Sequence, residues 1–498
     1  MFEAVELGRK VKKRDYAERV PTLRTELLTL QRELVEAGFS VLVVLGGVDG
    51  AGKSELANLL HEWMDARFLT AHAFGPPNDE EHDRPDHWRY WMSLPPAGRT
   101  GIYVGSWYTG PIVKRALGKI DDAQLDEAMQ RVVTFEQMLA DDGTLVLKFW
   151  LHLSEEQQTK RIAKLGKDPR TAWRVTKHER KLLRHHADMR RSAERALRLT
   201  STGPAPWVLV EAGHARYRNL TVAQTVLDRL RVHLEEHARQ RQAAAANPPA
   251  PEPEPDATLP TVLDRVDLSS RVDRDTYDSE LSRLQSRFGR LARHAQQVGQ
   301  CCTLVFEGWD AAGKGGCIRR LIHPLDARFF RVIPISAPTE EERAHHYLWR
   351  FWRHIPRAGH MTIYDRSWYG RVLVERVEGY ATHDQWQRAF KEINDFEEQL
   401  RDHGTVLLKF WLQVSQEEQL RRFEERRRIP WKQHKLTDED WRNREKAPLY
   451  MRAVNDMVAR TSTEFAPWSL VPAEDKHVAR LHVLQTACDA LDQALQSR

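Results

Sequence analysis

With 498 residues, the chain is long enough for two or three domains, each with its own buried core. Charged residues make up 30% of it and the net charge is only +5, which excludes an overall polybasic protein, so attraction to anions has to come from local clusters. No apolar run approaches the roughly 18 residues that span a bilayer, and the N-terminus lacks the apolar core of a signal peptide.

The cysteines indicate a reducing compartment. All four lie in the second half, and none has the paired spacing of a zinc site or of a disulfide framework: Cys301, Cys302, Cys317 and Cys488. We therefore expect a cytoplasmic protein with no membrane partner.

The first predicted strand covers residues 40–47 (SVLVVLGG) and leads into a loop with the spacing G-x-x-x-x-G-K-S. Such a loop turns backbone N–H groups and the positive end of a helix toward a phosphate, and its lysine reaches the outer phosphates. The loop residues of this first site are Gly47, Asp49, Gly52, Lys53 and Ser54.

The chain contains an internal duplication. Lys53 and a second loop lysine, Lys314, are 314 − 53 = 261 positions apart. The same shift superposes IYVGSWY (102–108) on IYDRSWY (363–369), LKFWL (147–151) on LKFWL (408–412), and APW (205–207) on APW (466–468). A constant shift of this kind indicates two copies of one domain.

Residues 241–260 separate the copies. Alanine, proline and acidic residues replace nearly every large apolar side chain there, which is typical of an extended, semi-rigid spacer. We therefore predict an N-terminal domain at 1–240, a linker at 241–260 and a C-terminal domain at 261–498.

Within each copy, short buried strands that end in glycine or in charged residues alternate with amphipathic helical stretches. This alternation predicts an α/β fold with a parallel sheet covered by helices on both faces. The ligand is then expected at the carboxyl ends of the strands.

The second loop, EGWDAAGKGGC at 307–317, keeps the spacing but has glycine in place of the hydroxyl residue. Its candidate phosphate-binding and catalytic residues are Gly308, Asp310, Gly313, Lys314 and Gly315. An unpaired carboxylate beside phosphates would repel them, so Asp310 is predicted to position a metal or the acceptor.

A second difference concerns charge beside the loop. The strand MTIYDRSWY ends in Asp365 and Arg366, where phosphoryl transfer needs a metal-holding carboxylate and a cation. The first copy has Val104 and Gly105 at these positions. The simpler interpretation of Asp365 and Arg366 is a weak surface ion pair.

A basic stretch at 421–446 follows a strand and a helical start, where nucleotide kinases place a mobile lid. Its cations are Arg426, Arg427, Arg428, Lys432 and Lys435. The first copy has its own set: Lys160, Arg161, Lys164, Lys167, Arg170, Arg174 and Lys177. The alternative is a solvated charged helix face.

Together, EGWDAAGKGG, YDRSWYGRVLVERV, LLKFWLQVSQEEQLRRF and IPWKQHKLTDEDW resemble the polyphosphate kinase type 2 family, and the tandem arrangement resembles its two-domain members, the polyphosphate:AMP phosphotransferases. The resemblance covers nearly the whole chain, and that family's loop ends in Gly-Lys-Gly. It implies tandem P-loop kinase-like domains, each a five-stranded parallel sheet with a helical lid. It also implies Mg²⁺, inorganic polyphosphate as donor and AMP as acceptor, giving ADP.

Carried over residue by residue, the resemblance places catalysis in the second copy, with Asp310, Lys314, Asp365 and Arg366, and with Asp310 and Asp365 as metal ligands. Glu375 and Arg376 also match the family pattern, without a role that the residues themselves explain. The first copy departs from the pattern at Val104 and Gly105, and we expect a structural or polyphosphate-holding role for it.

Other functions remain open at this point. A polyphosphate:ADP phosphotransferase and an ATP-dependent P-loop nucleotide kinase share the fold. A polyphosphate- or nucleic-acid-binding protein would use the loops only as anion sites, although packing explains its interleaved aromatic residues more simply. We expect no nucleic-acid partner, and a homo-oligomer is possible.

Overall fold

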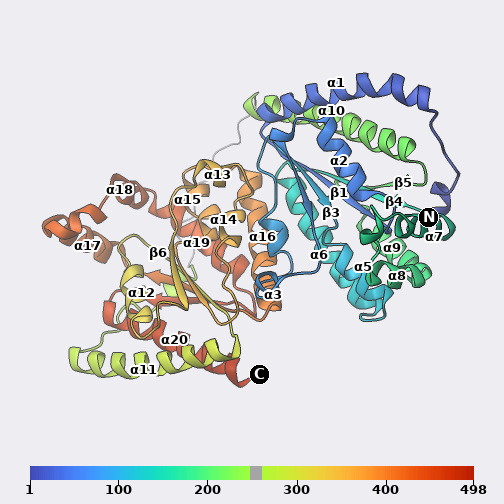
Figure 1. Ribbon diagram of the computed structural model, residues 1–498. Coiled ribbons are helices and arrows are strands. Elements are labelled where there is room, and N and C mark those ends of the chain that lie inside the picture. Colours follow the sequence, from blue (N-terminus) through green and yellow to red (C-terminus); the bar gives the residue numbers. More distant parts are fainter. Residues whose placement is uncertain (247–260, 498) are drawn as a thin grey trace. The chain divides into compact units, whose positions relative to one another are not determined.

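The computed structural model describes residues 1–246 and 261–497 and contains two compact units (Figure 1). The first unit consists of the described parts of Met1–Pro77, Arg89–Pro248 and Glu340–His346. The second consists of those of Asn78–Trp88, Pro249–Thr339 and Tyr347–Arg498. The two units therefore do not divide the chain at a single point.

The first unit is built on a parallel sheet with the strand order β2-β3-β1-β4-β5. The strands are β1 (Val41–Gly47), β2 (Leu69–Ala73), β3 (Thr100–Val104), β4 (Leu145–His152) and β5 (Trp207–Glu211). One face is covered by α1 (Lys13–Ala37), α2 (Lys53–Trp63) and α10 (Ala215–Ala246), and the other by α5 (Thr109–Ala116), α6 (Asp122–Asp141) and α9 (His186–Thr200) (Figure 1). The predicted lid comprises α7 (Glu155–Lys167), η3 (Ala172–Arg174) and α8 (Lys177–Arg184).

The second unit repeats this arrangement with the order β7-β8-β6-β9-β10, again all parallel. The strands are β6 (Cys302–Gly308), β7 (Phe330–Pro334), β8 (Met361–Asp365), β9 (Val406–Gln413) and β10 (Trp468–Pro472). One face is covered by α11 (Arg274–Val298), α12 (Lys314–Ile322) and α20 (Lys476–Gln496), and the other by α16 (His383–Asp402) and α19 (Ala447–Thr461) (Figure 1). The predicted lid comprises α17 (Gln416–Arg428), η6 (Pro430–Lys435) and α18 (Asp438–Glu445).

The remaining elements are short. They are η1 (Phe2–Val5), η2 (Ala66–Phe68), α3 (Asp79–His82), α4 (Trp88–Trp91), η4 (Leu263–Arg265), α13 (Glu340–Arg343), α14 (Trp349–Trp352), η5 (Trp368–Arg371) and α15 (Val374–Val377).

The strand registers confirm the duplication. Val41 pairs with Thr100 in the first sheet and Cys302 with Met361 in the second, which are the same pairing shifted by 261 positions. The predicted α/β fold, with five parallel strands in each copy, is therefore confirmed. The edge strands β2 and β7 were not located in the sequence, because their partly exposed residues form no continuous apolar run.

Helix α10 continues through the alanine run to Ala246, so the first six residues of the predicted linker are helical. Alanine has the highest helix propensity, which explains the extension beyond the predicted boundary at 240. The rest of the predicted linker, residues 247–260, lies outside the described residues. Among the helices of the described chain, none is long and apolar enough to cross a membrane.

Each core contains one buried lysine with the same three partners. Lys409 Nζ donates to Glu397 Oε2 at 2.7 Å, Tyr369 Oη at 3.0 Å and the Thr461 carbonyl at 2.6 Å. Lys148 Nζ makes the equivalent bonds at 2.6, 2.9 and 2.7 Å to Glu136, Tyr108 and Thr200. Because both copies retain this network, it belongs to the fold rather than to the chemistry of one site.

Candidate active site

The second phosphate loop connects the central strand β6 to the N-terminus of α12. Gly308 has φ +145°, and a Cβ there would lie 2.6 Å from the Leu412 carbonyl oxygen of the neighbouring strand. Gly313 caps the helix with φ +113°. Only glycine accepts these conformations and this close approach without strain, so the two positions fix the loop against the sheet.

Lys314 lies in the first turn of α12 and folds back over its own loop. Its Nζ donates to the carbonyls of Gly308 at 2.7 Å and Trp309 at 3.2 Å. Burial lowers the pKa of Lys314, and the charge of Asp310 opposes that shift. The ammonium therefore lies at the loop, where it is available to exchange carbonyl oxygens for phosphate oxygens.

Asp310 lies inside the loop and is held on both oxygens. Its Oδ1 accepts a bond from Arg366 Nη2 at 3.0 Å, and its Oδ2 accepts one from Asn443 Nδ2 at 2.8 Å. The side chain is only 13% exposed. Burial alone would raise the pKa of Asp310, but Lys314, Arg366 and the bond from Asn443 hold it below its usual value. Asp310 is therefore an ionised carboxylate at neutral pH.

Arg366 follows strand β8 in a left-handed conformation, with φ +64°, which is uncommon for a residue other than glycine. Its N–H donates to the Phe306 carbonyl of β6 at 3.0 Å. This backbone conformation directs the guanidinium toward the loop aspartate. Backbone strain of this kind is often found at functional sites.

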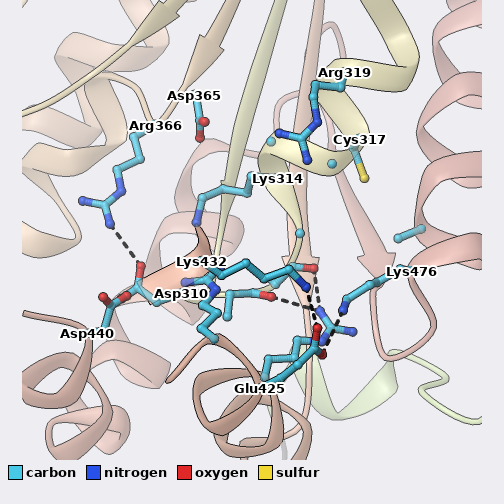
Figure 2. A pocket seen from close by; sticks show the side chains of 18 of the residues that line it. Asp310, Lys314, Cys317, Arg319, Asp365, Arg366, Glu425, Lys432, Asp440 and Lys476 are labelled. Atoms are coloured by element: carbon cyan, nitrogen blue, oxygen red, sulfur yellow. Dashed lines mark hydrogen bonds and ion pairs between the residues drawn. The ribbon is translucent and has the colours of Figure 1, made fainter. Parts of the chain in front are cut away.

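Asp365 ends β8 next to β6, paired with Phe306. Its Oδ2 lies 4.0 Å from the position that a Cβ on Gly315 would take. The sheet register therefore brings Asp365 over the loop, and Figure 2 shows its carboxylate beside Lys314 and Arg366. The simpler interpretation of Asp365 and Arg366 as one surface ion pair does not describe this geometry, because Arg366 pairs with Asp310.

Glu307, immediately before Gly308, is a further charged group that the sequence analysis did not identify as functional. It is buried, and its Oε1 accepts a bond from Ser367 Oγ at 2.8 Å. Burial raises the pKa of Glu307, and the hydrogen bond from Ser367 opposes the shift. The first copy has Gly46 at this position.

A cavity of about 650 Å³ opens over the second loop (Figure 2). Its lining includes eight cationic side chains and five carboxylates, so it carries a net positive charge that suits a polyanion. The cations are Lys314, Arg319, Arg366, Arg422, Arg426, Lys432, Lys476 and Arg480. The carboxylates are Asp310, Asp365, Glu425, Glu439 and Asp440.

Arg422 in the lid helix α17 ties the lid to the loop. Its Nη1 donates to the carbonyls of Ala311 and Ala312 at 3.0 and 2.9 Å, and its Nη2 donates to those of Ala473 and Glu474 at 2.7 and 2.9 Å. The side chain is only 3% exposed. The guanidinium thus joins three segments that are distant in the sequence.

The structure brings only some of the predicted lid cations to the cavity. Arg426 and Lys432 line it, and Lys432 Nζ pairs with Glu425 at 2.6 Å. Arg427 and Arg428 are exposed and do not belong to the lining. The side chain of Lys435 lies outside the described part of the chain.

Glu375 and Arg376 lie outside the cavity lining. Glu375 pairs with Arg371 at 3.2 Å. Arg376 is buried, pairs with Asp456 at 2.8 Å, and its guanidinium carbon lies 3.9 Å from the centre of the Trp386 ring. These contacts join α15 to α16 and α19, which is a packing role.

Several cavity residues escaped sequence analysis, among them Arg319, Arg422, Asn443, Lys476 and Arg480. A position-by-position comparison of the copies contains a signal for three of them. Asn58, Ala215 and Asn219 stand in the first copy where Arg319, Lys476 and Arg480 stand in the second. Three cations that line the cavity of the second copy therefore have uncharged residues at the equivalent positions of the first copy.

The first loop has the same backbone features as the second. Gly47 has φ +132°, a Cβ there would lie 2.3 Å from the Leu151 carbonyl, and Lys53 Nζ donates to the Gly47 and Val48 carbonyls at 2.7 and 3.2 Å. Asp49 lies 3.6 Å from Lys53. The partners that hold Asp310 are absent, because Gly105 and the buried Leu182 replace Arg366 and Asn443.

Together, the two doubly covered parallel sheets, each with a phosphate loop at its central strand and a helical lid, define a tandem protein of the P-loop kinase-like class. The family model for Polyphosphate kinase 2 (PPK2) matches residues 10–238 and again 271–498. The chain belongs to the polyphosphate kinase 2 family.

Known relatives match either nearly the whole chain or about half of it. The polyphosphate:AMP phosphotransferase of Pseudomonas aeruginosa is 46% identical over 495 residues, 99% of each chain. The GDP-polyphosphate phosphotransferase of Mycobacterium tuberculosis is 37% identical over 224 residues, 45% of this chain and 76% of that protein. A crystal structure of a putative polyphosphate kinase 2 from Pseudomonas aeruginosa PA01 matches with a TM-score of 0.88 and 44% identity, covering both chains completely.

Proposed function

We propose that this protein transfers the terminal phosphate of inorganic polyphosphate to AMP, giving ADP, and that the second copy carries out the reaction. The observation that supports the assignment to one copy is the set of charges on the second loop: Asp310, Asp365 and Arg366 gather beside Lys314 in a cationic cavity. The full-length relatives named polyphosphate:AMP phosphotransferase support the choice of substrates.

The reaction makes one bond and breaks one. An oxygen of the AMP phosphate attacks the terminal phosphorus of polyphosphate, and the phosphoanhydride bond to the next phosphate breaks. The leaving oxygen keeps the electron pair, so the shortened polyphosphate departs as an anion. Because the AMP phosphate is already ionised at neutral pH, no general base is required, and positioning with charge neutralisation accounts for catalysis.

Each residue has a part in this proposal. The loop N–H groups and Lys314 hold the transferred phosphate, and Arg366 neutralises charge that develops on it. The lid, tied to the loop by Arg422, brings Arg426 and Lys432 over the cavity and excludes water. Arg319, Lys476 and Arg480 hold the donor chain by charge.

The carboxylates of Asp310 and Asp365 fit Mg²⁺. Among the described residues, no three His, Cys, Asp or Glu side chains form a metal cluster. Mg²⁺ in kinase sites takes one or two carboxylates and completes its shell with water and substrate phosphates, which agrees with the two aspartates. Bound there, it would neutralise phosphate charge.

The decisive assay incubates the full chain with AMP, polyphosphate and Mg²⁺ in the absence of ATP, and follows ADP by chromatography. We expect ADP to form and EDTA to stop it. Absence of ADP, or formation of ADP from AMP only when ATP replaces polyphosphate, would refute the proposal. Parallel reactions with ADP and GMP test the alternative that a different acceptor is preferred.

We also propose that the protein works in the cytoplasm. The four cysteines are buried and none forms a disulfide within the described part of the chain, which suits a reducing compartment. Fractionation of the native host followed by immunoblotting tests this, and recovery of the protein outside the cytoplasmic fraction would contradict it.

A further inference from the structure

The two loops differ in what covers them. In the second copy, Gly313, Gly316 and Ala479 line the open cavity, and a Cβ built on Gly313 would meet nothing within 4 Å. The first copy has Glu55 and Arg218 in place of Gly316 and Ala479. Two small residues beside an open loop are thus replaced by two long charged ones.

Arg218 packs directly on the first loop. Its Nη1 donates to the Ala51 carbonyl at 2.9 Å and lies 1.7 Å from the position that a Cβ on Gly52 would occupy. The side chain is only 3% exposed. The guanidinium therefore fills the space that is open beside Gly313 in the second copy.

Glu55 lies in the first turn of α2 and adds a negative charge at the same place. Its Oε1 accepts a bond from Arg161 at 2.7 Å, and its Oε2 lies 3.4 Å from Arg218 Nη2. Its Oε2 also lies 3.1 Å from the Cβ position of Gly52. A carboxylate at a helix N-terminus is stabilised by the helix dipole and repels a phosphate that approaches the same helix end.

The arginine that binds the loop backbone also comes from a different helix in each copy. In the second copy, Arg422 of the lid helix donates to the Ala312 carbonyl. In the first copy, Arg218 of α10 donates to the corresponding Ala51 carbonyl, and Arg161, which corresponds to Arg422, pairs with Glu55 instead. The loop is thus tied to a helix of the core rather than to the lid.

We propose that the Glu55–Arg218 pair closes the first phosphate loop, so that only the second loop of each chain binds phosphate. Arg161 and Arg218 both pair with Glu55, and the loop lysine Lys53 lies 3.6 Å from Asp49. The first loop keeps the backbone of a phosphate site, but Arg218 fills the space beside it and Glu55 places a negative charge where phosphate would bind.

The test is calorimetric titration of the full chain with tripolyphosphate, at about 0.3 M salt so that exposed charges are screened. We expect the wild type to bind through the second loop alone, with Lys53→Ala changing the affinity less than about twofold. The variant Glu55→Gly/Arg218→Ala, which carries the residues of the second copy, is expected to gain a second site that Lys53→Ala removes.

Two results would overturn this proposal. One is a wild-type site that Lys53→Ala abolishes, and this result does not depend on how any double variant folds. The other is a double variant that keeps the wild-type melting temperature and AMP phosphorylation but gains no site. The inference goes beyond the proposed function and fails separately from it. A wild-type chain that binds no tripolyphosphate would count against phosphate binding at the second loop, whereas the double variant would still test the first loop.

Discussion

The two copies have the same sheet, the same loop backbone, the same loop lysine and aspartate and the same buried lysine network, yet they differ in the charged residues at the end of the strand beside the loop. The second loop has Asp365 and Arg366 beside it, and the first has Val104 and Gly105. Gly105, with φ +77°, has the left-handed conformation that Arg366 adopts in the other copy. The comparison teaches that the function of a phosphate loop depends on the side chains around it, because the first loop keeps the same backbone although the adjacent charged residues have been replaced.

The largest difference is expected between the two loop lysines. Lys314→Ala should lower kcat by about a thousandfold, because it removes a cation from the transferred phosphate, whereas Lys53→Ala should leave activity within about twofold. Steady-state ADP formation from AMP and polyphosphate measures both. Equal losses would mean that the first loop also takes part in catalysis.

The strand-end pair gives a similarly large effect. Asp365→Asn should lower kcat by at least about a hundredfold, since a neutral amide holds a metal and orients phosphates poorly. The reciprocal graft, Val104→Asp with Gly105→Arg in a Lys314→Ala background, should not restore activity because Glu55 and Arg218 still cover the first loop. Restored turnover in the graft would show that these two positions alone separate the copies.

Replacing the buried lysine should lower the stability of both units by a similar amount. Lys148→Met and Lys409→Met each leave a buried carboxylate unpaired, and each should destabilise its own unit by about 3–5 kcal/mol. Urea unfolding followed by tryptophan fluorescence measures the loss. A much smaller loss of unfolding free energy in the first unit would indicate that its core depends less on the buried lysine than the core of the second unit does.

A moderate effect is expected at the tie between lid and loop. Arg422→Ala should lower kcat by about 10- to 100-fold through misplacement of the loop and lid, and Arg422→Lys should restore little because lysine lacks the planar fork. Arg161→Ala, at the equivalent position, should leave activity unchanged. A higher KM for polyphosphate with an unchanged kcat would identify Arg422 as a donor-binding residue and not as a positioning residue.

The smallest effect is expected at Gly315. A Cβ there would lie 3.7 Å from Arg319 and 4.0 Å from Asp365, which are ordinary contacts. Gly315→Ser, which copies Ser54 of the first loop, should keep activity within about twofold and should not make ATP a donor. A switch of donor would show that the hydroxyl determines the choice between polyphosphate and ATP.

Part of the site was predictable from the sequence because its residues lie in short segments directly after predicted strands. The loop glycines, Lys314, Asp310 and the pair Asp365 and Arg366 each follow a recognisable strand, and parallel strands end at one edge of a sheet. The lid was harder to predict because, of its four named cations whose side chains the structure describes, Arg426 and Lys432 line the cavity whereas Arg427 and Arg428 face solvent. Which helical residue faces the cavity depends on how the helix packs.

By itself, the sequence determined the duplication, the α/β fold, the phosphate loops and the loss of charge at positions 104 and 105, because these follow from periodicity and from spacing within short segments. Only the tertiary structure showed that Lys476 and Arg480 reach the second loop and that Arg218 lies on the first. The physical reason is distance in the chain: these side chains come from helices more than 100 residues away, and only the packing of the sheet brings them to the loops.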